Sequence, residues 1–238
     1  MVEGVVALRR LLELPGWEVR TIAVLPKVAE RLAPLLEGRD EVCVVDEAAL
    51  REVVGFDLHR GALASVQRRP MATLADVLAT DPDPLLVAAE AVNDHENLGA
   101  LYRNAAALGA AAVVLDDRCA DPFYRRSVRV SSGNVLAVPT VAVPEGEPLV
   151  PWLRGHGLGT IALTPAGDVE LDALPAATVR GATALVVGAE GPGLSPAALH
   201  AADVRASIEM GPGVDSLNVA TAAAVALHRV RALRRLGQ

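Results

Sequence analysis

Short apolar runs alternate with stretches of helical spacing along most of the chain. In the first third, apolar runs predict strands over residues 19–25, 42–45 and 63–66, and apolar positions at helical spacing predict helices over residues 27–36 and 47–54. Because strands and helices alternate, these residues indicate a small α/β unit.

From residue 85 the apolar runs become nearly continuous. They predict strands at residues 85–92, 111–116, 136–143, 159–164, 182–191 and 204–210. Helical patterns lie at residues 98–108 and 121–130, and an Ala-rich helix runs from about residue 216 to the C-terminus. Continuous apolar strands separated by helices are typical of a parallel sheet covered on both faces. Ligands bind such sheets at the carboxyl ends of the strands, so the loops after the strands are the candidate functional segments.

A polar stretch separates the two patterns. Residues 68–84 contain three prolines, and they lie beyond the strands and helices that make up the first α/β unit. We therefore expect a smaller domain over residues 1–67, a linker over residues 68–84 and a larger domain over residues 85–238.

The composition indicates a globular chain. Of its 238 residues, 52% are hydrophobic and 21% are charged, which excludes an intrinsically disordered chain. No apolar run approaches the roughly 18 residues that span a bilayer, and charged residues interrupt the first segment where a signal peptide would be apolar. We expect a cytoplasmic protein without a membrane span. Cys43 and Cys119 stand far apart and the five histidines are scattered, so the sequence predicts no metal site.

The charge is negative overall but unevenly distributed. A formal net charge of −7 argues weakly against a protein that coats nucleic acid through its whole surface. Positive charge nevertheless gathers at Arg125, Arg126 and Arg129, and again in the four arginines between residues 229 and 235. These clusters are either nucleic-acid-binding patches or solvated helix faces.

The first candidate segment, residues 91–110, is a polar turn after a strand, followed by a helix. Asn97 lies where it can cap the helix or face the cleft. Gly99, Arg103 and Ala106 share one helical face, so Arg103 lies between two residues with almost no side chain, which leaves space for a ligand. The alternative is a capping Asn97 and a solvated Arg103.

The second segment, residues 184–195, is an apolar strand that runs into a glycine-rich turn. Gly188, Gly191 and Gly193 let the backbone approach a ligand closely or adopt a positive φ. The turn lacks the lysine of a Walker A loop and the spacing of a dinucleotide-binding loop, so phosphate binding is disfavoured. Glu190 lies among the glycines and would bind hydroxyl groups or a cation. The alternative is an ordinary turn after a strand.

The third segment, residues 207–228, joins a short strand to the Ala-rich helix through a Gly-Pro-Gly loop. Asp215, Ser216 and Asn218 lie where the helix begins. Either Asp215 or Ser216 can cap the helix, which leaves the other residue and Asn218 free to face outward near exposed backbone N–H groups. The small residues of the helix also indicate a tightly packed core or a subunit interface.

Taken in this order over residues 85–238, the three segments resemble the SpoU-class, or TrmH-like, RNA ribose 2′-O-methyltransferases of the SPOUT superfamily. Residues 1–66 look similar to the small L30e-like substrate-binding domain that many members carry, including the sequence HRGALASV at 59–66, and we expect that this domain is clipped at its N-terminus. The resemblance implies an α/β domain with a deep trefoil knot, a homodimer formed through that domain, and S-adenosylmethionine as the cofactor. It also implies methylation of a ribose 2′-hydroxyl in structured RNA, rRNA more than tRNA.

The resemblance assigns roles to particular residues. The implied catalytic residues are Asn97, Arg103, Glu190, Ser216 and Asn218. The implied cofactor-binding residues are Thr164, Gly188, Gly191, Ile208, Met210 and Leu217. In an RNA-modifying protein, the candidate RNA contacts become Arg125, Arg126 and Arg129. Two positions depart from the usual pattern, since Glu209 stands where the family has Pro, and Asn104 where it has Ser or Thr.

Two other classes of function fit parts of the sequence. A non-catalytic knotted module could bind RNA without turnover, and a doubly wound enzyme could bind a nucleotide at the same strand ends. Titration with S-adenosylmethionine separates the hypotheses, because a binding module would ignore it and a nucleotide-binding enzyme would prefer its own ligand. The implied methyl transfer requires no metal.

Overall fold

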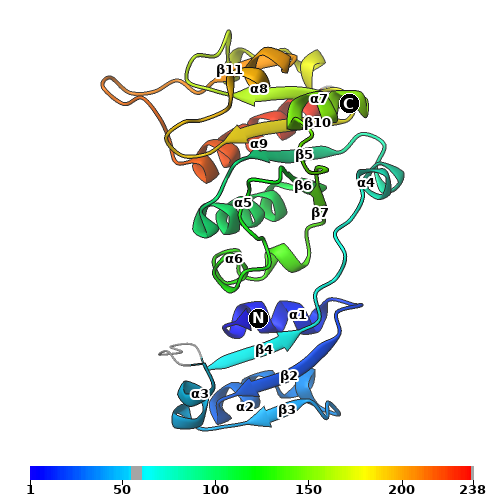
Figure 1. The fold of residues 1–238 in the computed structure, drawn as a ribbon, viewed down its shortest axis with the longest axis vertical. Coiled ribbons are helices and arrows are strands. Elements are labelled where there is room, and N and C mark those ends of the chain that lie inside the picture. Colours follow the sequence, from blue (N-terminus) through cyan, green and yellow to red (C-terminus); the bar gives the residue numbers. More distant parts are fainter. Residues whose placement is uncertain (55–60, 237–238) are drawn as a thin grey trace.

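The structure is a computed structural model that describes residues 1–54 and 61–236. Within these residues the chain forms a four-stranded sheet and a seven-stranded sheet, which follow one another along the long axis of the molecule (Figure 1). The N-terminal strands form the smaller sheet and the later strands form the larger one. The two α/β patterns in the sequence thus correspond to two sheets.

The smaller sheet has the strand order β1-β4-β2-β3. Strand β2 is parallel to β3 and antiparallel to β4, which is antiparallel to β1. Its strands and helices are β1 (Val2–Glu3), α1 (Val5–Glu13), β2 (Val19–Val24), α2 (Pro26–Leu36), β3 (Val42–Val44), α3 (Glu47–Val54) and β4 (Ala62–Val66). The sequence analysis does not predict α1 or β1, and β1 is too short for a periodic pattern. Residues 59 and 60, which begin the HRGALASV sequence, lie outside the described residues.

Part of the predicted linker is a helix. Helix α4 (Leu74–Thr80) begins at a capping box, in which the Thr73 hydroxyl accepts a hydrogen bond from the Asp76 N–H and the Asp76 carboxylate accepts one from the Thr73 N–H. Leu74 and Val77 are buried in an apolar cluster of the larger sheet. This part of the segment therefore belongs to the packing of the larger sheet.

The larger sheet has the order β7-β6-β5-β10-β8-β11-β9, and each of its described strand pairs is parallel. Its strands are β5 (Leu85–Glu90), β6 (Ala112–Leu115), β7 (Thr140–Ala142), β8 (Gly159–Leu163), β9 (Val169–Glu170), β10 (Thr183–Gly188) and β11 (Val204–Ser207). Every residue of β5 is buried, which explains why its apolar run is continuous. The predicted α/β class and the parallel sheet are confirmed.

Helices cover both faces of the larger sheet. They are α5 (His95–Leu108), α6 (Arg125–Val130), α7 (Leu149–Gly155), α8 (Pro196–Ala201) and α9 (Val219–Leu236). Successive residues of β5 contribute to different cores: Val87 packs with α5 and α9, whereas Leu86 packs with α4, α7 and α8. In the described part of the chain, no helix combines the length and the apolar character needed to cross a membrane.

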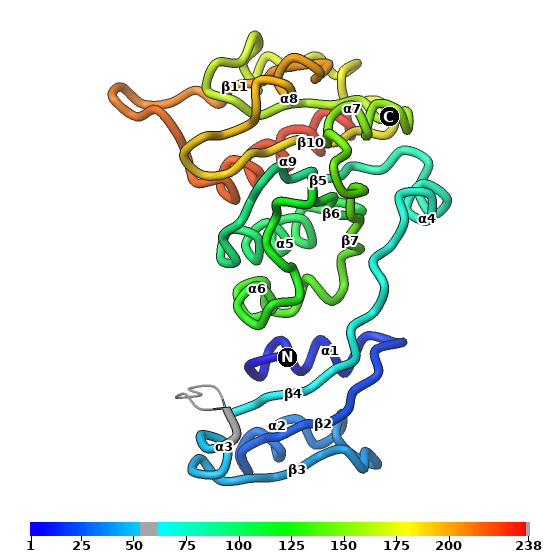
Figure 2. The backbone as a smooth tube through the Cα atoms, viewed as in Figure 1, coloured from blue at the N-terminus to red at the C-terminus, as the bar shows by residue number. Residues whose placement is uncertain are grey.

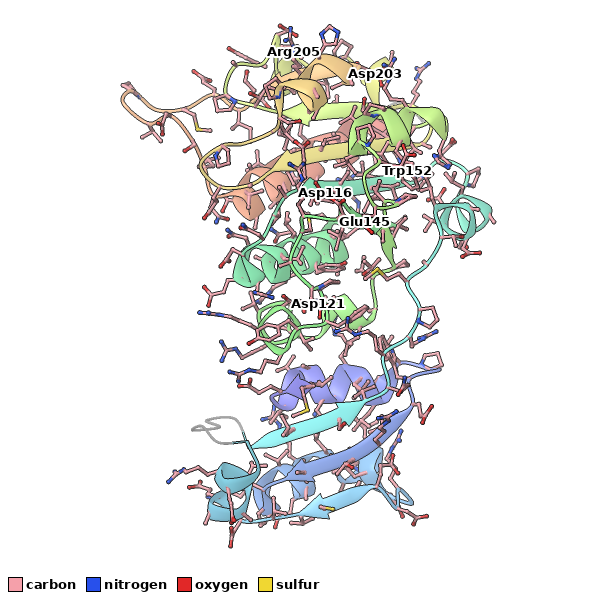
Figure 3. The ribbon with its side chains drawn as sticks, viewed as in Figure 1. Asp116, Asp121, Glu145, Trp152, Asp203 and Arg205 are labelled. Atoms are coloured by element: carbon pink, nitrogen blue, oxygen red, sulfur yellow. The ribbon has the colours of Figure 1, made fainter. Side chains whose placement is uncertain are left out.

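The smaller sheet packs on the larger one through α1 and the segment before α6. The Trp17 indole N–H donates a hydrogen bond to the Leu136 carbonyl oxygen at 3.2 Å. The Arg68 guanidinium pairs with Asp121, which lies beside α6 in Figure 3. One cluster of buried apolar side chains includes members of both sheets. Apolar contact, a hydrogen bond and an ion pair thus fix the two sheets together.

Candidate functional site

Polar residues from the three candidate segments meet at the carboxyl ends of β5 and β10. The side-chain NH₂ of Asn218 donates one hydrogen bond to Asn97 Oδ1 and one to Glu190 Oε1, each at 2.7 Å. Asn97 comes from the first turn of α5, Glu190 from the turn after β10, and Asn218 from the residue before α9. Three of the five predicted catalytic residues are therefore in direct contact, and we call them the junction.

Asn218 also caps α9. Its Oδ1 accepts hydrogen bonds from the N–H groups of Ala220 (3.0 Å) and Thr221 (3.2 Å). The Asn218 side-chain oxygen thus accepts hydrogen bonds from the start of α9, and both N–H groups of its amide donate hydrogen bonds within the junction. The prediction that Asp215 or Ser216 caps this helix is wrong, because the helix begins directly after Asn218.

Asn97 faces the junction and is not a helix cap. Asp94 occupies the cap position of α5, where its carboxylate accepts hydrogen bonds from the N–H groups of Glu96 and Asn97, both at 2.9 Å. The Asn97 residue is only 9% exposed, and its side-chain oxygen accepts the hydrogen bond from Asn218. Of the two interpretations of Asn97, the structure supports the one in which it faces the site.

The glycine-rich turn after β10 folds back on itself. The Gly193 N–H donates a hydrogen bond to the Ala189 carbonyl oxygen at 3.0 Å, and a Cβ added to Gly188 would lie 2.2 Å from the Gly193 carbonyl carbon. Gly191 and Gly193 have φ values of +85° and +68°, which residues with a Cβ rarely adopt. The glycines therefore permit a tight turn that presents the exposed Glu190 to the junction.

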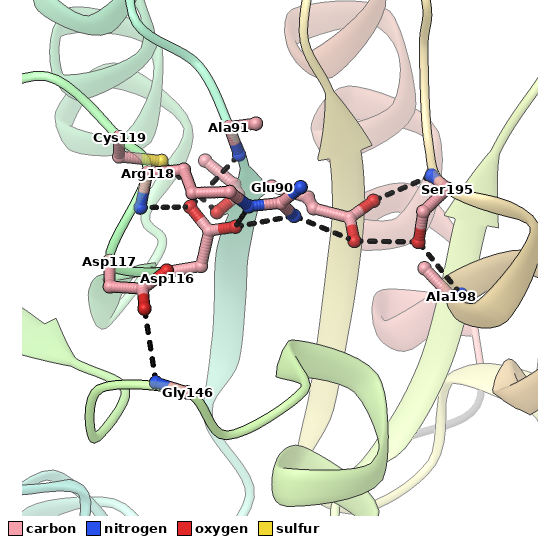
Figure 4. Close-up of polar contacts among 10 residues, drawn as sticks. Glu90, Ala91, Asp116, Asp117, Arg118, Cys119, Gly146, Ser195 and Ala198 are labelled. Carbon is pink, nitrogen blue, oxygen red and sulfur yellow. Dashed lines mark hydrogen bonds and ion pairs between the residues drawn. The ribbon is translucent and has the colours of Figure 1, made fainter.

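A buried carboxylate anchors the far end of this turn (Figure 4). Glu90, the last residue of β5, accepts hydrogen bonds from the Ser195 N–H (2.7 Å) and the Ser195 hydroxyl (2.8 Å). The Arg118 guanidinium bridges Glu90 at 3.1 Å and Asp116 at 2.8 Å, and both acidic residues are buried. Hydrogen bonding to Asp116 raises the pKa of Arg118. Local spacing does not predict this cluster, although a carboxylate at the end of an apolar strand is a visible signal of it.

Replacement of Ser195 tests this anchor. Its hydroxyl donates to Glu90 and accepts a hydrogen bond from the Ala198 N–H at the start of α8 (3.1 Å). Ser195→Ala removes a helix cap and a bond to a charged group, so we expect the free energy of unfolding in urea to fall by about 2 kcal/mol. Ser195→Thr keeps the hydroxyl and should recover most of that loss. A Ser195→Ala protein as stable as the wild type would contradict the anchoring role.

Arg103 lies on α5, six residues after Asn97 of the junction. It is exposed, and in residues 1–54 and 61–236 its guanidinium takes part in no hydrogen bond or ion pair. With Arg10 and Ala106 it lines a surface pocket of about 540 Å³. The space predicted beside Gly99 is filled by α6, since a Cβ at Gly99 would lie 2.8 Å from the Ser127 carbonyl oxygen. The predicted ligand space therefore exists only on the Ala106 side.

The two unusual positions differ in environment. The Asn104 side-chain NH₂ donates a hydrogen bond to the Ala220 carbonyl oxygen at 2.7 Å, which ties α5 to α9. Glu209 is exposed at the start of the loop before α9. Asn104 is thus a packing residue between two helices.

The loop between β11 and α9 extends away from the body of the molecule (orange in Figure 2). Residues 211–218 are all exposed, and the Ser216 hydroxyl donates a weak hydrogen bond to Asp215 at 3.3 Å. Among the described residues, the Val214 N–H, which donates to the Gly211 carbonyl oxygen, is the one backbone donor between positions 209 and 218 that has a partner. The loop therefore offers free backbone groups to a ligand.

The predicted cofactor-binding residues lie at the end of β10 and on the loops that follow β8, β10 and β11. Thr164 directly follows β8, and its hydroxyl accepts a hydrogen bond from the Ala166 N–H at 3.3 Å. Ile208 and Met210 are half-buried after β11, and Leu217 is exposed in the loop before α9. These residues and the glycine-rich turn share the carboxyl edge of the larger sheet.

The three predicted RNA-binding arginines are partly paired with acidic residues. Arg126 pairs with Glu96 at 2.8 Å, and both side chains are about half exposed. Arg125 and Arg129 approach the buried Glu3 at 3.6 Å. Their guanidinium groups still reach the surface, so the cluster joins the two sheets and also contributes positive charge to the outside.

Among the described residues, neither a metal centre nor a reactive thiol adjoins the junction. In the part of the chain that the structure describes, no three His, Cys, Asp or Glu side chains gather where they could hold a metal ion. Burial raises the pKa of the Cys119 thiol to about 12, and the thiol donates a hydrogen bond to the Ala89 carbonyl oxygen at 3.3 Å. Cys119 is therefore a packed thiol and not a nucleophile.

Comparisons with known proteins agree with this geometry. The SpoU rRNA Methylase family matches residues 84–228. An uncharacterized tRNA/rRNA methyltransferase of Mycobacterium tuberculosis is 40% identical over 246 residues, which cover 100% of this chain and 82% of that protein. The 23S rRNA (guanosine-2′-O-)-methyltransferase RlmB of Ralstonia nicotianae is 34% identical over 184 residues, which cover 76% of this chain and 73% of that protein.

Among solved structures, the SpoU methyltransferase AviRb from Streptomyces viridochromogenes in complex with the cofactor AdoMet has a TM-score of 0.81. Its sequence is 26% identical, and the match covers 100% of this chain and 91% of that chain. The family match includes the whole seven-stranded sheet and all three segments that Asn218 joins. The chain therefore belongs to the SpoU rRNA methylase family.

Proposed function

We propose that the protein transfers a methyl group from S-adenosylmethionine to a ribose 2′-hydroxyl of structured RNA in the cytoplasm, and that this RNA is ribosomal. The observation that carries the proposal is the junction of Asn97, Glu190 and Asn218, which unites the three segments of the family at one edge of the sheet. The relatives support the chemistry, since one is named as a guanosine-2′-O methyltransferase of 23S rRNA and another binds AdoMet.

Two loops at this edge are suited to bind S-adenosylmethionine through their backbone groups. Gly188 leaves no room for a side chain in the turn after β10, and the loop before α9 has backbone N–H groups without protein partners in the described chain. Bound there, the cofactor supplies a methyl group activated by its sulfonium sulfur. The residues proposed to hold it are Thr164, Gly188, Gly191, Ile208, Met210 and Leu217.

Arg103 is the proposed stabiliser of the attacking oxygen. A ribose 2′-hydroxyl ionises far above neutral pH, so negative charge that develops on its oxygen must be stabilised. A guanidinium remains protonated and is a poor base, but Arg103 has no partner in the described chain and is free to bind an oxyanion or the adjacent phosphate. The proton then leaves to phosphate or water.

Polar residues near the junction would position the ribose. Asn97 and Ser216, which lies on an exposed loop, would contact the ribose. Asn218, whose side-chain oxygen and both N–H groups are bonded within the protein, would act by orienting Asn97. Fixing the 2′-oxygen in line with the methyl carbon can contribute roughly 7–11 kcal/mol to the lowering of the barrier. Glu190 keeps the Asn218 amide oriented by accepting one of its hydrogen bonds.

The proposal extends to domain organisation. We assign residues 1–67 to an L30e-like RNA-binding domain and residues 85–238 to a knotted methyltransferase domain that forms a homodimer. The separate strand order of the smaller sheet supports the first assignment. The path of the chain after β11 supports the second assignment. The chain leaves β11 near one edge of the sheet and returns as α9, which packs on α5 and β10.

Positive charge on α6 should contribute to RNA binding. Neutralising Arg125, Arg126 and Arg129 together should flatten the salt dependence of RNA affinity by roughly two units, with unchanged cofactor affinity. The matched control neutralises three arginines outside the proposed RNA-binding regions, namely Arg154 and Arg205, which form ion pairs, and the exposed Arg180. An unaltered slope in the α6 variant would contradict the assignment of these arginines.

Calorimetric titration with S-adenosylmethionine, followed by transfer of labelled methyl groups to rRNA, tests the function. The proposal predicts binding, transfer, and a dimer in sedimentation at micromolar concentration. A protein that binds rRNA but not S-adenosylmethionine would instead be a non-catalytic RNA-binding module. Full activity as a monomer would remove the homodimer from the proposal.

A further inference from the structure

We propose that the rings of Tyr124 and His95 form a stacking site for an unpaired RNA base beside the junction. The centroids of the two rings lie 4.4 Å apart, with an angle of 47° between the ring planes. The inference rests on the proposed function because it assumes an RNA substrate. It adds a contact to the base, whereas the residues discussed above would contact ribose, phosphate or cofactor.

The ring pair lies at the same edge of the larger sheet as the junction. His95 is the first residue of α5, two positions before Asn97, and Tyr124 directly precedes α6. These helices follow β5 and β6, which are adjacent parallel strands whose carboxyl ends lie side by side. An ion pair between Glu96 and Arg126 joins the same two helices. A nucleotide next to the one held at Asn97 could therefore reach the rings.

Burial in the apolar core does not explain the position of Tyr124. The neighbouring Phe123 ring packs on the apolar core and lies edge-on to Trp17 at 6.0 Å. Tyr124 is 45% exposed and belongs to neither apolar cluster. Within residues 1–54 and 61–236, its hydroxyl has no hydrogen-bond partner. The ring is thus available to a ligand.

Backbone hydrogen bonds order the segment that carries the Tyr124 ring. The Tyr124 N–H donates a hydrogen bond to the Asp121 carbonyl oxygen at 3.2 Å, and the Tyr124 carbonyl oxygen accepts one from the Val128 N–H at 3.1 Å. His95 lies at the start of a helix that Asp94 caps. Because both rings stand on ordered backbone, the protein would lose little conformational entropy when a base stacks on them.

The charge beside the rings favours RNA over an apolar peptide. Arg125, Arg126 and Arg129 follow Tyr124 on α6, and their guanidinium groups reach the surface. Single-stranded nucleic acid is commonly bound by aromatic rings that stack on bases next to cations that contact phosphates. Tyr124 and the α6 arginines provide both parts in one short segment.

The test uses the full chain and a single-stranded RNA of mixed sequence that carries the fluorescent base 2-aminopurine. Tyr124→Ala should weaken RNA affinity by about tenfold and abolish the quenching of 2-aminopurine that stacking produces. Tyr124→Phe keeps the ring and should retain both within about twofold. Met71→Ala, which shortens an exposed apolar side chain in the segment between the two sheets, is the control for lost surface area. The melting temperature and S-adenosylmethionine affinity should not change in any variant.

Wild-type affinity and quenching in Tyr124→Ala would overturn the inference. An equal loss in Tyr124→Phe would also overturn it, because the hydroxyl and not the ring face would then bind RNA. Methyl transfer by the wild type, measured in parallel, separates this inference from the proposed function. If the wild type transfers methyl groups while Tyr124→Ala behaves as wild type towards RNA, only the stacking site fails. If the wild type neither binds S-adenosylmethionine nor transfers methyl groups, the proposed function fails.

Discussion

Arg103→Ala should lower the single-turnover rate of methyl transfer by at least about a hundredfold, the scale of losing one oxyanion donor. Affinity for S-adenosylmethionine should stay nearly unchanged, because Arg103 lines a pocket with Arg10 and, among the described residues, forms no hydrogen bond or ion pair with the glycine-rich turn or the loop before α9. The rate is measured with RNA and cofactor in excess over their dissociation constants, and the cofactor affinity by calorimetry.

Arg154→Ala is the matched control, because it removes the same side chain from α7 on the other face of the sheet. It should leave both the rate and the cofactor affinity unchanged. A near wild-type single-turnover rate in Arg103→Ala would remove Arg103 from the mechanism. A large loss of cofactor affinity in the same variant would place Arg103 at the cofactor instead of the RNA.

Gly188→Val should weaken S-adenosylmethionine binding by about tenfold to a hundredfold. The first added carbon would lie 2.2 Å from the Gly193 carbonyl carbon and 2.4 Å from the Leu194 nitrogen, so the turn must open. Overpacking of this kind costs about 1–3 kcal/mol, which is the size of the expected loss if the closed turn is the binding form. Calorimetry on the folded variant measures the change.

Gly155→Val is the matched control for the loss of a glycine, because a Cβ there meets nothing within 4 Å and its φ is not positive. It should bind the cofactor as tightly as the wild type. A Gly188→Val protein that keeps the far-ultraviolet spectrum and the cofactor affinity of the wild type would show that the turn after β10 does not hold the cofactor.

The sequence predicts the larger sheet well because burial on both faces leaves a continuous apolar run in each long strand. It predicts the junction less completely. The motifs identify Asn97, Glu190 and Asn218, but the hydrogen bonds that join them connect residues as far as 121 positions apart. Such pairings follow from tertiary structure, so the sequence cannot specify which oxygen receives each Asn218 donor.

Two errors at the site have physical causes. The Ala-rich pattern does not mark where α9 begins, so the sequence predicts Asp215 or Ser216 as its cap, whereas the observed start directly follows Asn218. Gly99 indicates an absent side chain, but the sequence does not reveal that α6 fills the space. A glycine in the sequence indicates that a ligand or another part of the chain approaches the backbone closely, and only the fold shows which of the two it is.

The polar clusters that support the site are the part least visible in the sequence. Glu90 and Ser195 lie 105 residues apart and are joined by two hydrogen bonds. Glu3, which faces Arg125 and Arg129, belongs to a two-residue strand with no periodic pattern. These contacts could not be predicted from local spacing, because each pairs residues from different strands or helices.

Mapping of ribose methylation in total RNA, from cells with and without the protein, tests the assignment of a 2′-O-methyltransferase most directly. A 2′-O-methyl group makes the adjoining phosphodiester resistant to alkali, so each modified nucleotide appears as a gap in the hydrolysis pattern. We predict that one or more rRNA positions lose this resistance when the protein is absent, and regain it with the wild type but not with Arg103→Ala. An unchanged ribose-methylation pattern, or the loss of a base methyl group instead, would contradict the assignment.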